Sequence, residues 1–160
     1  MNKIYIIMSL LACLLMSCNN DDKYEMNYPT PADTMHLTAS SANVVLDGSR
    51  PDEIAVSFRW NPAAQREEGV EILYYFKYWL TSAGSKSVEK IDVMPETMEY
   101  SLTNKQLLNY LDECEVVLGE TVEVEAEIIA DIQSTYYMKP EVSKTLILVS
   151  TDNSNIEIER

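Results

Sequence analysis

Apolar and polar positions alternate most clearly along residues 70–80. Every second residue of this run is apolar, giving one unbroken face of Val70, Ile72, Tyr74, Phe76, Tyr78 and Leu80. A period of two sorts side chains onto the two faces of a strand, whereas a helix would scatter them around its circumference. We therefore predict that residues 70–80 form the central strand of a β-sandwich. Tyr75 and Trp79 would lie on its other face, which need not be fully covered.

Shorter alternating segments, separated by turn-forming glycines and prolines, predict further strands. They are residues 36–41, 43–46, 54–60, 87–94 (an edge strand), 121–132 and 142–149. In one of them, Ile54, Val56, Phe58 and Trp60 are expected to point inward. In another, Glu123, Glu125 and Glu127 form a solvated outer face, with Lys77 as a cross-strand partner.

One helix interrupts the β pattern. Thr103-Asn104-Lys105-Gln106 is a capping box, in which the side chains of Thr103 and Gln106 bond each other's backbone amides. The helical face that follows is apolar and consists of Leu107, Leu108, Leu111 and Cys114. Many short strands with one helix predict a mainly β fold, an immunoglobulin- or fibronectin-III-like antiparallel sandwich.

Composition and charge narrow the classes of partner. The chain has 160 residues, 46% of them hydrophobic, which is enough for one domain with a real core. Its formal net charge of −14 repels phosphate backbones and anionic headgroups, so nucleic-acid binding and electrostatic membrane adsorption are not expected.

The N-terminus predicts export and a lipid anchor. Lys3 precedes a short apolar run, residues 4–16, that is too brief to span a membrane. The run ends in Leu15-Met16-Ser17-Cys18, which resembles the bacterial lipobox, where cleavage leaves an acylated cysteine. The alternative is an ordinary secretory signal with an incidental cysteine.

The domain organisation follows from this N-terminus. We expect a signal peptide over 1–17, a tether over 18–34, a sandwich domain over 35–150 and a polar tail over 151–160. Asn19-Asn20-Asp21-Asp22 resembles the export signal of surface-displayed lipoproteins in glycan-foraging Gram-negative bacteria, although these residues could equally be plain tether.

A more particular resemblance covers roughly residues 35–150. Four segments together resemble the N-terminal domain of SusE-type outer-membrane lipoproteins. They are Val44-Val45-Leu46-Asp47, the strand 54–60 with Asn61-Pro62-Ala63, the tyrosine-rich strand, and Tyr100-Ser101-Leu102-Thr103 leading into Leu107-Leu108. The resemblance implies a surface lipoprotein working beside a TonB-dependent glycan importer and its partner lipoprotein. The resemblance also implies that multi-domain members bind glycan largely through C-terminal modules, and we expect this chain to contain the first domain alone. A spacer or docking role is therefore as well supported as direct sugar binding.

The sequence gives little support for catalysis or for a cofactor. His36 is the only histidine, so a histidine-based metal cluster or catalytic triad has little to draw on. Glycosidases need two acids converging from different elements, whereas the glutamates of 121–132 repeat along one strand face. Once Cys13 is removed and Cys18 acylated, Cys114 is left alone, as a small hydrophobe on the helix.

Aromatic side chains are the strongest candidates for a binding site. Sugar C–H faces stack on flat rings while nearby amides and acids bond the hydroxyls. The candidate ligand-binding residues are Tyr75, Trp79, Asp131, Gln133, Tyr136 and Tyr137. The competing interpretation, which we favour, is that these rings are covered or mark a protein interface. The leading hypothesis is a non-catalytic, surface-anchored accessory subunit of a polysaccharide uptake system; the alternative is a structural or adhesin-like interaction lipoprotein.

Overall fold

The computed structural model describes residues 32–82 and 90–151. The predicted signal peptide 1–17, Cys18 and the acidic run after it lie outside the described residues. So do residues 83–89, which hold the start of the predicted edge strand 87–94, and the tail beyond Thr151.

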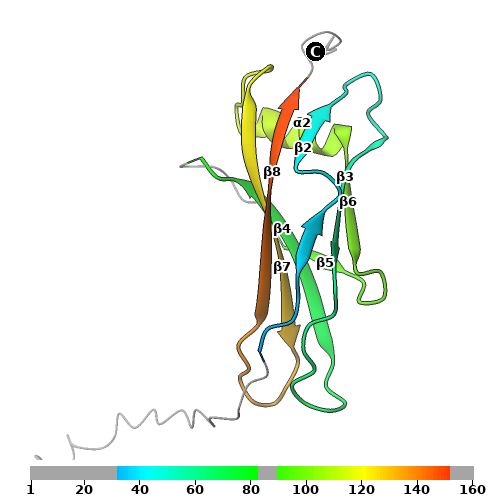
Figure 1. The fold of residues 1–160 in the computed structure, drawn as a ribbon, viewed down its shortest axis with the longest axis vertical. Coiled ribbons are helices and arrows are strands. Elements are labelled where there is room, and N and C mark those ends of the chain that lie inside the picture. The colour runs from blue at the N-terminus through cyan, green and yellow to red at the C-terminus, as the bar shows by residue number, and fades with distance from the viewer. Residues whose placement is uncertain (1–31, 83–89, 152–160) are drawn as a thin grey trace, which may run out of the picture. The chain divides into compact units, whose positions relative to one another are not determined.

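The described residues form eight strands and one helix. The elements are β1 (Leu37–Ala39), β2 (Asn43–Leu46), β3 (Ile54–Trp60), β4 (Ile72–Leu80), β5 (Ile91–Val93), β6 (Glu99–Thr103), α2 (Asn104–Glu113), β7 (Thr121–Ile132) and β8 (Glu141–Thr151). They build a three-stranded sheet in the order β1-β3-β6 and a five-stranded sheet in the order β2-β8-β7-β4-β5 (Figure 1). The predicted mainly β sandwich with one short helix is confirmed.

Two details of the predicted sheet are corrected. The strand order places β7, not the tyrosine-rich β4, at the centre of the five-stranded sheet. The reason is length, because β7 pairs along its course with both β4 and β8, while the other neighbour of β4 is the three-residue β5. In addition, β2 pairs with β8 in parallel, so this sheet is mixed.

Strand β4 has the predicted faces. Tyr74, Phe76, Tyr78 and Leu80 are buried and Tyr75 and Trp79 are half-buried on the other side. The strand begins two residues later than expected, because its pairing with β7 begins at Ile72, opposite Ile132, the last residue of β7. The chain turns just before, at Gly69, whose φ of 78° suits glycine.

The two sheets and the helix share one core. The Phe76 ring of the larger sheet lies 5.0 Å from Phe58 and 4.7 Å from Tyr100, both of the smaller sheet, between centroids. Tyr78 packs edge-on against Tyr110 of α2 at 5.0 Å. Rings from β3, β4, β6 and α2 therefore meet between the two layers.

Two further expectations about strands are corrected. Ile54, expected inward, is 63% exposed, because the pairing of β3 with β6 shifts register between Ile54 and Val56. Strand β6 was not predicted, since its alternation is weak and Leu102 is its one fully buried residue.

The helix is capped as its sequence predicts. The Gln106 N–H donates to Thr103 Oγ1 at 3.3 Å, and the Thr103 N–H donates to Gln106 Oε1 at 2.9 Å. Leu107 and Leu111 are buried as expected, and Tyr110 joins them. Cys114 ends the helix as its half-buried C-cap and is a free cysteine.

The chain enters the sandwich through a segment bonded to both sheets. The Met35 N–H donates to the Glu141 carboxylate, and the Leu37 N–H donates to Ser143 Oγ at 2.9 Å, both on β8. On the other side, the exposed His36 donates its N–H to Asn61 Oδ1 at 2.8 Å, just after β3. We call residues 33–39 the entry segment. It joins the two layers at one end of the sandwich.

Candidate binding surfaces

Three of the predicted site residues share the outer face of the five-stranded sheet. Cross-strand pairing places Tyr75 beside Ile129, Trp79 beside Glu125, and Asp131 beside Leu73. Tyr75 and Trp79 are four residues apart on β4, which separates them by about 13 Å along the strand. The two rings therefore occupy separate places on this face.

Two lysine side chains lie over the ring of Trp79. The ammonium groups of Lys144 and Lys77 lie 4.8 and 5.2 Å from its ring centroid. Cations are attracted to the π face of an indole ring. A sugar could stack on Trp79 only after displacing these ammonium groups.

Two glutamates hold the lysines in place. Lys77 pairs with Glu127 at 2.8 Å, and Lys144 pairs with Glu125 at 3.2 Å and with Glu127 at 3.3 Å. The predicted partnership of Lys77 with this glutamate face is therefore confirmed. Desolvation lowers the pKa of Lys144, but the hydrogen bonds that its ammonium donates to Glu125 and Glu127 outweigh it and leave that pKa raised.

The expectation that Glu127 is solvated is wrong. Only 6% of Glu127 is exposed, because it lies on the central strand between Lys77 of β4 and Lys144 of β8. Two cations compensate for burying its carboxylate.

Tyr75 resembles Trp79 in its surroundings. The Lys90 ammonium lies 5.0 Å from the Tyr75 ring centroid, and the ring is half-buried. The outer sheet face therefore presents aromatic rings already in contact with lysines, which is a poor platform for an uncharged ligand.

The β7–β8 loop, residues 133–140, presents free aromatic rings. Tyr137 is 91% exposed and Tyr136 is 58% exposed. Beside them, Gln133 Nε2 donates to Asp131 Oδ2 at 3.2 Å, and the Tyr136 N–H donates to Ser134 Oγ at 3.1 Å. Four of the six predicted ligand-binding residues thus lie at one end of the five-stranded sheet.

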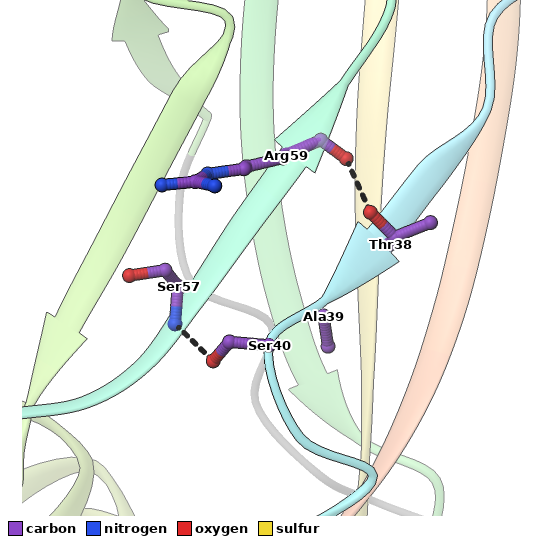
Figure 2. Close-up of a pocket in the computed structure, with 5 residues that line it drawn as sticks. All are labelled: Thr38, Ala39, Ser40, Ser57 and Arg59. Carbon is purple, nitrogen blue, oxygen red and sulfur yellow. Dashed lines mark hydrogen bonds between the residues drawn. The ribbon is translucent and has the colours of Figure 1, made fainter.

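A shallow hollow lies on the outer side of the three-stranded sheet. Its volume is about 340 Å³, and its lining residues are Thr38, Ala39, Ser40, Ser57 and Arg59 (Figure 2). Ser40 Oγ accepts from the Ser57 N–H at 3.0 Å, and Thr38 Oγ1 donates to the Arg59 carbonyl at 3.2 Å. Because these groups bond one another, the hollow is a weak candidate for ligand recognition.

A buried carboxylate lies near the β7–β8 loop, and the sequence did not single it out. Glu141 is 0% exposed, accepts the N–H groups of Met35 and Ala64, and lies 3.9 Å from Arg66. Arg66 in turn pairs with Asp33 and donates to the Lys139 carbonyl at 2.8 Å. Glu141 holds backbone together, so we assign it a structural role.

A metal-binding cluster and a membrane-spanning helix are both absent from the part of the chain that the structure describes. Residues 32–82 and 90–151 contain no group of three or more acidic, histidine or cysteine side chains that could hold a metal ion. The same residues include no helix with the length and apolarity needed to cross a membrane.

The fold defines a β-sandwich domain, and comparison with known families gives its affiliation. The SusE outer membrane protein family matches residues 20–129, more than half of the chain. The chain therefore belongs to the SusE outer membrane protein family. No curated protein matches it. Tyr75 and Trp79 lie within the matched residues, whereas Asp131, Gln133, Tyr136 and Tyr137 lie beyond them.

Proposed function

We propose that this protein is a non-catalytic, lipid-anchored accessory subunit of a polysaccharide uptake system, displayed at the cell surface, that binds glycan through its β7–β8 loop. Its family places it among outer-membrane proteins of the starch-utilisation type. The observation that carries the glycan proposal is the pair of exposed rings Tyr136 and Tyr137 beside the bonded Asp131 and Gln133.

The loop suits a carbohydrate better than the sheet face does. Tyr136 and Tyr137 are free to stack against sugar C–H faces, and Asp131 and Gln133 offer acceptor and donor groups for hydroxyls. Lysines already contact Tyr75 and Trp79. We therefore place the glycan at Tyr136 and Tyr137 and leave Tyr75 and Trp79 out of the site.

Isothermal titration calorimetry against a panel of soluble polysaccharides tests this proposal. Tyr137→Ala should weaken binding about five- to thirtyfold, because a lost ring contact costs ~1–2 kcal/mol. Trp79→Ala is the matched aromatic control and should leave the affinity unchanged. If the binding heat is retained in Tyr137→Ala but lost in Trp79→Ala, the glycan site lies on the sheet face. If no glycan gives binding heat, the protein does not bind glycan.

The anchor has its own test. Lys3, residues 4–16 and Leu15-Met16-Ser17-Cys18 support acylation of Cys18. Mass spectrometry of the protein from membranes should find a lipid-modified N-terminal Cys18, and Cys18→Ser should release it from the membrane fraction. An unmodified residue 18 in membrane-derived protein would contradict the anchor.

The second candidate function is a docking module without a small-molecule ligand. Exposed apolar side chains on β2 and β8, described next, favour it. Purification of the membrane-anchored form should recover a TonB-dependent importer or its partner lipoprotein if the protein works in uptake. Recovery of adhesion or assembly proteins instead would favour the structural role.

A further inference from the structure

Exposed apolar side chains gather on the outer face of β2 and β8. Val45 is 66% exposed, Leu146 47% and Leu148 36%. We name these three residues the β2–β8 patch. Each is the outward residue of an alternating strand whose inward neighbours, such as Leu46 and Ile147, are buried. The pleat of each strand therefore points these three side chains away from the core and toward the outer surface.

The patch is continuous across the two strands. Asn43 pairs with Leu148 and Val45 with Ser150, so Val45 lies diagonal to Leu148 on the same face. Leu146 and Leu148 follow each other on one side of β8. Figure 1 shows β2 and β8 side by side, with the end of β8 beside β2.

No described element covers this face. Helix α2 buries Leu107, Tyr110 and Leu111 in the core between the sheets, so it packs on the inner side. The outer side of the three-stranded sheet is different in character, since Thr38, Ser57 and Arg59 line it and bond their neighbours. The two outer faces of the sandwich are thus unlike each other.

The charges around the patch indicate what fits it. Glu123 is the cross-strand partner of Leu148. Glu125, the partner of Leu146, is already paired with Lys144, so it adds no free acid to the border of the patch. Glu120 and Glu123 are exposed and, among residues 32–82 and 90–151, neither forms an ion pair. A second copy would bring acids against acids in a chain of net charge −14. The complementary surface is apolar and bordered by lysine or arginine.

We propose that the β2–β8 patch docks another protein through an apolar segment flanked by basic residues, a function separate from the glycan proposal. Apolar contact at the centre of such an interface supplies affinity, and the acidic border selects the partner and its orientation. The surface lies on β2 and β8, away from Tyr136 and Tyr137 in the β7–β8 loop. The two proposals can therefore fail independently.

A synthetic peptide with alternating leucine and lysine serves as the probe, and a leucine–glutamate peptide of the same length is its control. We expect the lysine peptide to bind and to shift the NMR signals of Val45, Leu146 and Leu148. The double variant Leu146→Ser/Leu148→Ser should weaken binding at least tenfold. Ile54→Ser removes a side chain of similar exposure from the other sheet and should leave binding within twofold.

Several results would overturn the proposal. Equal binding by the double variant, or shifts mapped elsewhere, would mean that the peptide responds to net charge alone. Sedimentation showing a dimer that Leu148→Ser dissociates would make the occupant a second copy. A polysaccharide that shifts the same three signals would make the patch a glycan site.

A photo-crosslinker at position 146 tests the same proposal in cells. It should capture one defined protein, and Glu123→Lys should abolish that capture. Capture that Glu123→Lys leaves unchanged would also overturn the docking proposal.

Discussion

At the scale of single residues, Glu141 shows how a polar side chain can organise the chain around it. Its carboxylate is fully buried and accepts the N–H groups of Met35 and Ala64, which are far apart in sequence. Buried backbone donors need an acceptor, because leaving them without one costs their full desolvation. Glu141 therefore fixes both the entry segment and the start of the β3–β4 connection.

We expect Glu141→Ala to lower the free energy of unfolding by ~3 kcal/mol, the range seen when one partner of a buried charged network is removed. Urea denaturation followed by circular dichroism measures this. The exposed Glu68 is the control, and Glu68→Ala should change stability by less than ~0.5 kcal/mol. A Glu141→Ala protein as stable as the parent would mean that water satisfies these amides.

Strands and helices formed as predicted where a local sequence pattern, such as alternation or a capping box, coincides with a face that is buried in the core. Strand 54–60 has the same bounds in sequence and structure, and helix α2 starts at its capping box. Strand β6 was missed because its stability comes from pairing with β3, which sequence alternation does not report. The central position of β7 is likewise a property of sheet order, set by which strands pair.

The candidate site was only partly predictable for a related reason. The sequence singled out Tyr136 and Tyr137 as candidates but favoured rings that are covered or at a protein interface, whereas the structure leaves them 58% and 91% exposed. The covering of Trp79 depends on Lys144, which β8 brings to the same face from 65 residues away in sequence (144 − 79). Burial of Glu127 has the same origin, since its two lysines come from different strands.

At the scale of the helix, Thr103→Ala should destabilise the protein by ~1 kcal/mol, because it removes the acceptor for the Gln106 N–H. Thermal or urea unfolding measures the loss, and Thr135→Ala in the exposed β7–β8 loop is the matched control. Because Thr103 and Gln106 bond each other, Thr103→Ala/Gln106→Ala should cost clearly less than the sum of the single changes. Strict additivity would show that the capping box does not act as a unit.

At the scale of the whole molecule, tyrosines from three elements meet in the common core. Burial raises the pKa of Tyr78 to about 12, and burial also raises the pKa values of Tyr100 and Tyr110. In the unfolded chain these phenols ionise near pH 10, so between pH 10 and 12 the unfolded state has lost protons that the folded state keeps. Raising the pH therefore favours unfolding.

The contribution of these tyrosines to stability should be constant between neutral pH and pH ~9 and fall between pH 10 and 12, with Tyr78 contributing up to ~1.4 kcal/mol per pH unit. Urea midpoints measured across this range give the slope. Tyr78→Phe removes the ionisable group and should make the slope shallower while changing the neutral-pH value much less. Equal alkaline slopes for the two proteins would show that the Tyr78 phenol does not titrate with unfolding.

The parallel pairing of β2 with β8 has a consequence for how the protein acquires its structure. Val44 lies beside Val149, so the first strand of the larger sheet has its only neighbour near the opposite end of the domain's sequence. Closing such a long chain loop costs entropy before the contact repays it, and folds rich in distant pairings assemble slowly. Until residues 141–151 have emerged, β7 lacks one of its two neighbours and β2 has none, so we expect this sheet to form late, after synthesis of the last strand.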